Sequence, residues 1–391
     1  MNQFDFIEEL DLRKFVAPEF VYGKGAINLT GRYAKNLGLS KVLVVSDEGV
    51  VAKGWTERVL DSLDAAGVSY SLFTAVNQNP RDFQVSEGAE VYAGAGCDAI
   101  VAVGGGSPMD CAKGIGIAHS NRKPILSFEG IDNVPIPGPP LICIPTTAGS
   151  SADMSQFAII TDTKEKRKIA IVSKSMVPDI SLVDPETTTT MDKSLTAHTG
   201  LDALTHAVEA FVSTAHSPLT DLHALEAIRL IFCYLPKVLQ DPLNITLRSK
   251  VMRGSLEAGL AFSNAILGAA HAMAHSLGGY LDYAHGECNA ILLSEVVRAN
   301  FSAVPDRYRR IAAVMDLDEA NMTDDEVQDI LVKEISLLAH KAGVYQTLGD
   351  LGVTKEDIPR LADNALRDPC LSTNPKELSK QEIIEIYERC L

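Results

Sequence analysis

The chain has 391 residues, of which 46% are hydrophobic and 22% are charged, and a globular chain of this length is expected to form two domains, each with its own core. Its 51 acidic and 35 basic residues give a formal net charge of −16, which repels nucleic-acid phosphates and anionic lipid headgroups. We therefore expect no nucleic-acid partner and no membrane partner.

The sequence favours a cytoplasmic location. Residues 1–15 carry scattered acidic side chains and lack the basic start and apolar run of a secretory signal. No apolar stretch reaches the ~18 residues of a membrane span. The seven cysteines are widely scattered and include no CxxC pair, so reduced thiols are the simplest interpretation.

Short β-branched runs alternate with helical stretches in the first half of the chain, which is typical of a parallel sheet with crossover helices. The Gly23–Gly25 segment follows no strand signal and is interpreted as a simple turn. Helices are expected near residues 56–66 and 85–95. Strands are expected at residues 41–47, 69–73, 98–103 and 141–144, and a hairpin at 157–160 and 168–171.

The pattern of apolar residues changes at about Asp192, where they begin to recur at helical spacing and strand signals become rare. We therefore predict an α/β domain at residues 1–188 and an all-helical domain at residues 189–391.

A run of three glycines, Gly104 to Gly106, lies between an apolar strand and a predicted helix with Ser107 and Asp110 in its first turn. Free N–H groups at such a helix start favour an anion such as a pyrophosphate. The motif is not GxGxxG, so a strand-to-helix turn without a ligand is an equal alternative. Asp47, at the end of the first predicted strand, can accept a hydrogen bond from a ribose hydroxyl, and a simple N-cap or turn aspartate is its alternative.

Three of the nine histidines lie in the segment HAMAHSLGGYLDYAHG. His271 and His275 are four residues apart, so they project from one face of a helix. We expect Gly278 and Gly279 to end this helix and to turn the chain back toward His285.

Asp202 and His206 are also four residues apart and approach from a second helix. Four nitrogen and oxygen ligands can thus meet between helices, and the absence of thiolates favours iron(II) or zinc(II) over a closed structural zinc site. A single HxxxH pair is more often a structural pair of histidines than a metal site. The DxxxH and HxxxH pairs together favour the metal.

The sequence resembles the iron-containing (group III) alcohol dehydrogenases over nearly its whole length. The shared motifs are YGKGA at residues 22–26, the Asn79-Pro80 pair, GGGSPMDCAK, IPTTAG at 144–149, GLDALTHAVEAF, GAAHAMAHSLGGYLDYAHG, and the CLSTNP segment that begins at Cys370.

The resemblance implies a dinucleotide-binding α/β domain followed by an all-α domain, the dehydroquinate synthase-like fold, with the active site between them. It implies that the metal ligands are Asp202, His206, His271 and His285. It places His275 near the nicotinamide as a catalytic residue that relays a proton, and Phe262 and Cys370 in the substrate channel. The NAD-binding residues that it implies are Asp47, Asn79, Gly105, Gly106, Ser107, Asp110, Thr146, Thr147, Ser150 and Lys168.

The expected function is a metal-dependent, NAD-linked interconversion of small primary alcohols and aldehydes by hydride transfer. The alternatives are a glycerol or diol dehydrogenase of the same fold, a dehydroquinate synthase-like lyase, and a regulatory homologue that binds NAD without turnover. We expect assembly into a homodimer or a larger homo-oligomer. The chain departs from the family pattern at residues 149–153, at His198 and at residues 292–297. None of these changes removes a ligand, but the first two lie near the cofactor and the substrate, which puts the identity of the substrate in question rather than the type of reaction.

Overall fold

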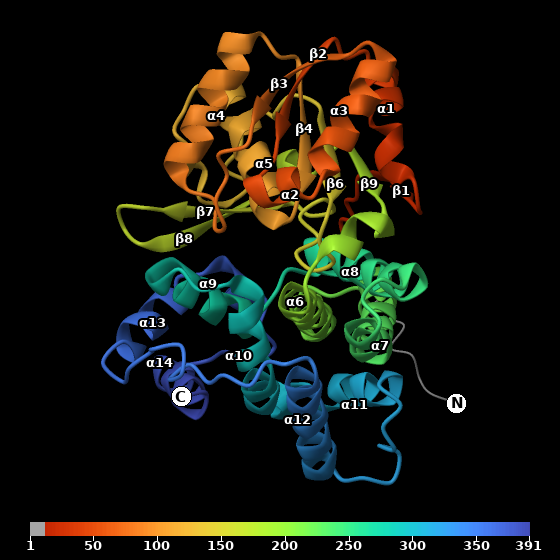
Figure 1. Ribbon diagram of the computed structural model, residues 1–391. Coiled ribbons are helices and arrows are strands. Elements are labelled where there is room, and N and C mark those ends of the chain that lie inside the picture. The colour runs from red at the N-terminus through yellow and green to blue at the C-terminus, as the bar shows by residue number, and fades with distance from the viewer. Residues whose placement is uncertain (1–11) are drawn as a thin grey trace.

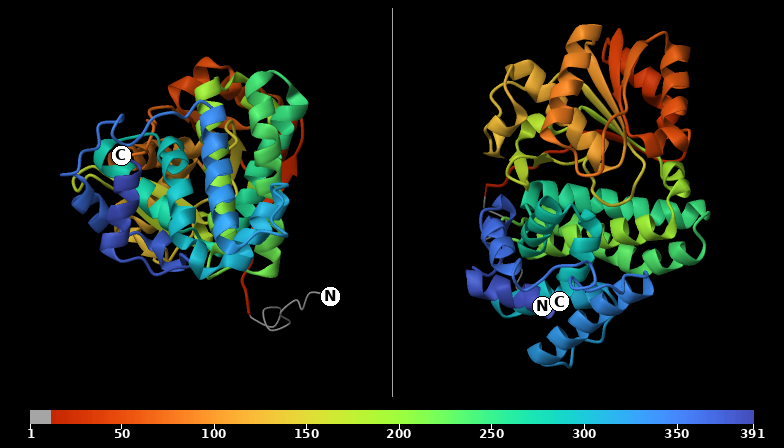
Figure 2. Two further views of the ribbon diagram at one scale, coloured as in Figure 1. Left: turned by 90° about the horizontal axis from the view of Figure 1, so that it is seen from below. Right: turned by 60° about the vertical axis from the view of Figure 1, so that its left-hand side comes forward.

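The computed structural model describes residues 12–391, which form an α/β body followed by a helical body (Figure 1). The right-hand view of Figure 2 shows the same division, with the helical body below the sheet. Residues 1–11, most of the segment that we expect to lack a secretory signal, lie outside the described residues. None of the helices within residues 12–391 is long and apolar enough to cross a membrane.

A six-stranded sheet with parallel neighbours forms the centre of the first body. Its strands, in spatial order, are β1 (Glu19–Tyr22), β9 (Ile180–Val183), β6 (Leu141–Pro145), β4 (Ala99–Gly104), β2 (Lys41–Val45) and β3 (Ser69–Phe73). The α-helices of this body are α1 (Thr30–Asn36), α2 (Glu48–Ala52), α3 (Trp55–Ala66), α4 (Asp82–Ala95) and α5 (Gly106–Asn121).

Helices cover both faces of the sheet, and alternate residues of its strands face opposite sides. Val42 and Val44 of β2 share a core with residues of α1 and α3. Leu43 and Val45 share another core with residues of α4 and α5. Since the strands run parallel, the loops that follow β2, β4 and β6 emerge at one edge, which is where ligands of such sheets bind.

The predicted strands at β2, β3, β4 and β6 are confirmed, and the predicted hairpin is the antiparallel pair β7 (Phe157–Asp162) and β8 (Arg167–Val172). Strand β5 (Gly130–Ile131) extends this hairpin to a second, three-stranded sheet. Strand β1 was not predicted, because it has only four partly exposed residues and pairs only with β9. The turn at Gly23–Gly25 therefore does follow a strand.

The second body is helical over the described residues. Its α-helices are α6 (Lys193–Val212), α7 (Pro218–Gln240), α8 (Ile245–Ala265), α9 (Ala269–Leu281), α10 (His285–Asn300), α11 (Pro305–Val314), α12 (Asp324–Lys341), α13 (Ile358–Ala365) and α14 (Lys380–Arg389). Short 3-10 helices occur in both bodies. They are η2 (Ala26–Leu29), η3 (Ile125–Phe128), η4 (Lys174–Met176), η5 (Pro185–Thr190), η6 (Phe301–Ala303) and η7 (Pro369–Thr373). The fold class, an α/β body followed by an all-α body, is as predicted. A domain boundary at residue 188 would fall within η5 and stays a prediction.

The β7–β8 hairpin joins the two bodies. Ile160 and Ile169 belong to the core that the parallel sheet shares with α4 and α5, whereas Phe157 and Ala170 belong to the core of the helical body. Figure 1 accordingly shows the hairpin between the sheet and α9.

Gly278 and Gly279 do not end a helix, contrary to the prediction, because α9 continues through them to Leu281. A Cβ atom on Gly279 would lie 2.6 Å from the Lys168 backbone nitrogen, and one on Gly278 would lie 2.8 Å from Lys168 Nζ. These glycines therefore let α9 approach β8 closely.

Candidate active site

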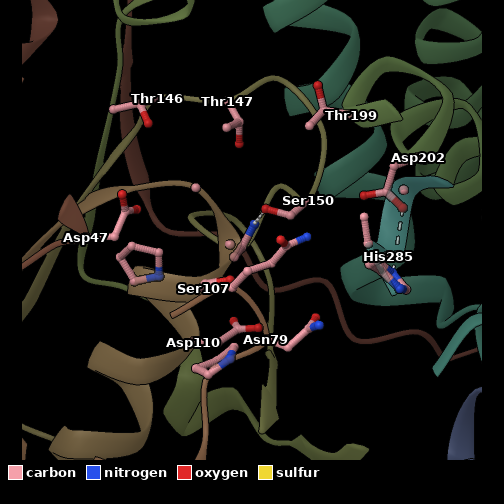
Figure 3. A pocket seen from close by; sticks show the side chains of 18 of the residues that line it. Asp47, Asn79, Ser107, Asp110, Thr146, Thr147, Ser150, Thr199, Asp202 and His285 are labelled. Carbon is pink, nitrogen blue, oxygen red and sulfur yellow. Dashed lines mark hydrogen bonds and ion pairs between the residues drawn. The ribbon is translucent and has the colours of Figure 1, made fainter. Parts of the chain in front are cut away.

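One cavity of about 750 Å³ lies between the carboxyl edge of the parallel sheet and the helical body. In Figure 3 the cofactor-side residues occupy the left and centre, and Asp202 and His285 lie at the right. The predicted site residues that line this cavity are Asp47, Asn79, Gly105, Gly106, Ser107, Asp110, Thr146, Thr147, Ser150, Lys168, Asp202, His206, Phe262, His271, His275 and His285.

The glycines after β4 bring two loops into contact. A Cβ atom on Gly105 would lie 3.2 Å from Thr147 Cγ2, and one on Gly106 would lie 2.9 Å from Ser150 Oγ. Gly105 is the N-cap of α5, and no side chain caps that helix end. Gly106 and Ser107, in the first turn of α5, line the cavity, and a helix start without a side-chain cap suits a phosphate.

Asp47 caps a helix at the wall of the cavity. It is the N-cap of α2, where its Oδ1 accepts a hydrogen bond from Val50 N at 2.9 Å. Its side chain also lines the cavity. The N-cap interpretation is therefore correct as geometry, and hydrogen bonding to a ribose stays a prediction.

Two charged groups near the centre of the cavity have shifted pKa values. Burial raises the pKa of Asp110 to about 6, against the lowering effect of Lys113, and its Oδ2 accepts a hydrogen bond from Ile159 N at 3.1 Å. Burial also lowers the pKa of Lys168.

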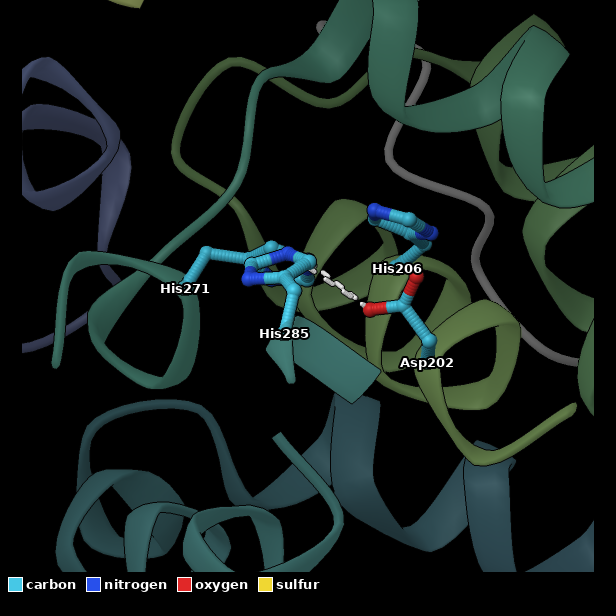
Figure 4. Close-up of side chains that lie close together, drawn as sticks. All are labelled: Asp202, His206, His271 and His285. Carbon is cyan, nitrogen blue, oxygen red and sulfur yellow. Dashed lines mark ion pairs between the residues drawn. The ribbon is translucent and has the colours of Figure 1, made fainter. Parts of the chain in front are cut away.

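The predicted metal ligands converge from three helices (Figure 4). Asp202 and His206 come from α6, His271 from α9 and His285 from the start of α10, and one potential ligand atom of each lies within 4.8 Å of the others. Asp202 Oδ1 is 3.7 Å from His271 Nε2 and 3.6 Å from His285 Nε2. Ligands about 2.1 Å from a tetrahedral ion lie roughly 3.4 Å apart, so the spacing and the three-nitrogen, one-oxygen donor set fit a divalent metal.

Most of these ligands favour the protonation states that a metal requires. Burial lowers the pKa of His206 to about 3 and that of His285 well below its usual value, so both imidazoles are neutral. Burial alone would raise the pKa of Asp202, but the histidines around it outweigh burial and lower it. The carboxylate is therefore ionised and the neutral imidazoles offer lone pairs.

Two supporting residues were missed in the sequence. Glu209 Oε2 lies 2.6 Å from His271 Nδ1, and Asn289 Nδ2 donates to Asp202 Oδ1 at 2.7 Å. Burial opposes protonation of His271, but Glu209 and Asp202 outweigh it and raise its pKa to about 9. Glu209 follows His206 by three residues on α6, so helical spacing could have shown that it shares the ligand face.

His275 lies beside the four ligands rather than among them. Its ring stacks on that of His285 with centroids 5.0 Å apart, and its Nδ1 lies 2.8 Å from Asp368 Oδ2. Asp368 was also missed, because it is 93 residues away in the chain. The carboxylate fixes the orientation of the ring, so that Nε2 is the nitrogen left for the cavity.

The two predicted channel residues occupy different places. The Phe262 ring stacks on His206 with centroids 4.3 Å apart and lines the cavity. Cys370 is fully buried and is not part of the cavity wall. Its thiol lies within 4.8 Å of potential ligand atoms of His275 and Asp368 instead. The backbone N–H of Cys370 donates a hydrogen bond to the Asp368 carboxylate at 2.8 Å, which keeps the two residues together.

Comparison with known proteins matches the description "Iron-containing alcohol dehydrogenase" over residues 17–185 and "Fe-containing alcohol dehydrogenase family, C-terminal" over residues 196–391. The chain belongs to the iron-containing alcohol dehydrogenases. The predicted family, fold class and alcohol dehydrogenase activity are thereby confirmed, and the predicted cofactors, NAD and iron, are those of this family.

Individual known proteins match the chain almost end to end. The 1,3-propanediol dehydrogenase of Citrobacter freundii is 40% identical over 370 residues, which are 94% of this chain and 96% of that protein. The NAD-dependent methanol dehydrogenase of Bacillus methanolicus is 33% identical over 377 residues, 96% of this chain and 99% of that protein. The crystal structure of a 1,3-propanediol oxidoreductase has a TM-score of 0.94 at 38% identity and covers 97% of this chain and 100% of that chain.

Proposed function

We propose that this cavity is the active site of a cytoplasmic, NAD-dependent alcohol dehydrogenase that interconverts small primary alcohols and their aldehydes. The observation that carries the proposal is the continuity of one cavity from the start of α5 to the four-ligand cluster. A dinucleotide bound along the sheet edge would bring its nicotinamide toward those ligands, as hydride transfer requires.

The residues proposed to hold the metal are Asp202, His206, His271 and His285. When bound, the iron would supply a Lewis acid for the alcohol or aldehyde oxygen. Glu209 orients His271 through the short contact to Nδ1, and Asn289 holds Asp202 by donating from its Nδ2 to Asp202 Oδ1. Such supporting contacts fix the direction of the ligands and strengthen binding.

The residues proposed to bind NAD lie on the loops at the sheet edge. The N-terminus of α5 would bind the pyrophosphate through the backbone of Gly106 and Ser107. Thr147 and Ser150 close the other side of that loop. Asp47 would accept a hydrogen bond from a ribose hydroxyl, and Lys168 would donate one nearer the nicotinamide.

Oxidation of the alcohol yields the aldehyde, NADH and one proton, so a residue must move that proton. We assign this role to His275, whose Nδ1 is held by Asp368 and whose ring borders the cavity. Phe262 narrows the cavity beside His206, and a narrow apolar wall favours small substrates. The names of relatives that act on propanediol, methanol and lactaldehyde support small alcohols as the substrate class.

The decisive experiment is a steady-state assay of the iron-loaded protein with NADH and a series of short aldehydes. Turnover with C2 to C4 aldehydes supports the proposal. NADH binding without turnover of any aldehyde would favour the regulatory alternative instead. With NAD in place of NADH, turnover of glycerol or diols alone would favour a dehydrogenase specialised for polyols.

We also propose that the protein is a homo-oligomer. Strand β1 is an edge of the parallel sheet, and Phe20 on it is 40% exposed. An open edge strand with an exposed aromatic ring can pair with another chain. Light scattering after gel filtration would test this, and a monomeric mass would contradict it.

A further inference from the structure

A carboxylate of the helical body binds a loop of the α/β body. Asp282 Oδ1 accepts a hydrogen bond from Asn79 Nδ2 at 2.9 Å, and Asp282 Oδ2 pairs with Arg81 Nη2 at 2.9 Å. The two oxygens of one side chain thus bind the residues on either side of Pro80. Asn79 itself lines the cavity.

This contact joins two turns with unusual backbone geometry. Asn79 has a φ of 56° and Asp282 a φ of 59°, in the left-handed region that residues other than glycine seldom adopt. Arg81 also donates to the carbonyl oxygens of Gln78 and Asn79, at 3.2 and 3.3 Å. The arginine, fixed by Asp282, therefore holds the turn that presents Asn79.

The contact also decides which group Asn79 offers to a ligand. Its Nδ2 donates to Asp282 Oδ1 and lies 3.4 Å from the carbonyl oxygen of Tyr283. Both amide hydrogens are thus directed at the helical domain. Oδ1 is the remaining polar atom of the side chain, so Asn79 would accept a hydrogen bond from the cofactor rather than donate one.

The same segment of the helical domain carries a metal ligand. Asp282 is the C-cap of α9, and His285 begins α10 three residues later. The short connection that contacts Asn79 through Asp282 and Tyr283 therefore also sets the position of His285.

We propose that Asp282 is a positioning residue that couples cofactor binding to metal binding. It holds Asn79 for the cofactor and the 282–285 connection for the metal, so that occupancy of one site favours occupancy of the other. By linkage, each ligand must then raise the affinity for the other by the same factor. The inference rests on the proposed function, because it takes Asn79 to bind NAD and His285 to bind the metal.

The expected effect is modest, because the ion pair is partly exposed. The side chain of Asp282 is 58% exposed and that of Arg81 is 23% exposed, so water and salt screen their attraction. The hydrogen bond to the buried Asn79 contributes more. We therefore expect changes of about threefold to tenfold in affinity.

The test is a fluorescence titration of NADH into full-length protein, first freed of metal and then loaded with zinc(II). Zinc should tighten NADH binding to the wild type several-fold. Asp282→Ala should raise the NADH dissociation constant of the zinc-loaded protein about threefold to tenfold and should remove most of the zinc effect. Asp282→Asn keeps an oxygen that can accept from Asn79, so its values should lie between those of the wild type and Asp282→Ala.

Asp324 provides a matched control. It pairs with Arg309 at 2.6 Å with side-chain exposures of 57% and 27%, but it lies on α12 and is not part of the cavity wall. Asp324→Ala should therefore leave both NADH constants unchanged.

Several outcomes overturn the coupling. One is a wild type whose NADH affinity does not respond to zinc, and another is an Asp282→Ala protein that behaves like Asp324→Ala. If circular dichroism shows that Asp282→Ala is unfolded, a wild-type zinc effect in Asp282→Asn would overturn it equally. A wild-type protein that binds no NADH in either form would instead contradict the proposed function.

Discussion

Glu209 Oε2 lies 2.6 Å from His271 Nδ1, and both side chains are almost completely buried. The other oxygen, Oε1, accepts a hydrogen bond from the Ala270 backbone nitrogen at 2.6 Å. One carboxylate of α6 therefore fixes both the ring of His271 and the start of the helix that carries it. This makes Glu209 a part of the proposed metal site although it contributes no ligand atom.

Replacing Glu209 with Gln should weaken metal binding about 10- to 100-fold, because the amide holds the imidazole less firmly and does not increase its basicity. Competition with a chelator measures this directly. Glu257→Gln is a matched control, since Glu257 pairs with His223 Nδ1 at 2.7 Å and neither residue belongs to the cavity wall. Equal metal affinity in wild type and Glu209→Gln would contradict the assignment.

Asp202→Asn and His271→Ala should each lower bound metal to near zero and abolish turnover. The fold and NADH binding should persist, weakened at most several-fold, because the ligands belong to the helical domain and the predicted NAD residues to the sheet edge. Metal analysis, circular dichroism and an NADH titration check these three statements. Full activity in a metal-free variant would contradict the mechanism.

His275→Ala should retain the metal and lose most of its turnover, since His275 is assigned to proton transfer and not to metal binding. Metal analysis beside kcat separates these roles. A loss of metal in this variant would show that His275 is a ligand and that one of its neighbours is wrongly assigned.

Asp368→Asn should destabilise the protein in a pH-dependent way. Burial favours the neutral acid, but His275 and the Cys370 N–H group outweigh it and lower the pKa of Asp368. A carboxyl with a lowered pKa stabilises the folded state above its unfolded value of about 3.9, and this stability is lost as the pH falls through the folded value. The variant should therefore be less stable by about 1–3 kcal/mol at pH 7, and the difference should shrink below about pH 4. Thermal unfolding at both pH values measures this, and a difference independent of pH would contradict it.

Phe262→Ala should extend activity to longer or branched alcohols, because removal of the ring leaves room in the cavity. The rate constant kcat/KM for a substrate with extra methylene groups should rise about tenfold or more relative to that for the short one. Since the ring also stacks on His206, metal content must be measured in the same preparation. An unchanged substrate profile with full metal content would place the channel elsewhere.

The parts of the fold that depend on local patterns could be predicted from the sequence. Buried strands such as β2 and β4 are continuous apolar runs, and Asp202 with His206 and His271 with His275 show the four-residue spacing of a helix face. Contacts between distant segments could not be predicted in this way. Glu209 and His271 are 62 residues apart, and His275 and Asp368 are 93 apart.

The glycines of α9 show why one local rule failed. Gly–Gly pairs often end helices because glycine tolerates left-handed geometry. Here the helix continues, because Gly278 and Gly279 are needed for the close approach of Arg167 and Lys168 on β8. The requirement comes from a strand more than a hundred residues earlier, and no local pattern shows it.

We expect cofactor choice to depend on the surroundings of Asp47. Its Oδ1 caps α2 through Val50 N, while the side chain also borders the cavity. The residues beside it in the chain, Ser46, Glu48 and Gly49, include no arginine or lysine. A carboxylate here would accept hydrogen bonds from the ribose hydroxyls of NAD but would repel the 2′-phosphate of NADP.

The wild type should therefore strongly prefer NAD, and Asp47→Gly should raise the use of NADP while it weakens the use of NAD modestly. Glycine is nearly as good an N-cap as aspartate, so α2 should lose only a few tenths of a kcal/mol, and a change in cofactor preference cannot be attributed to unfolding of that helix. The measurement is the ratio of kcat/KM for the two cofactors in wild type and variant. If Asp47 serves only as a helix cap, this ratio stays the same in both proteins, and a wild type that already prefers NADP contradicts the assignment outright.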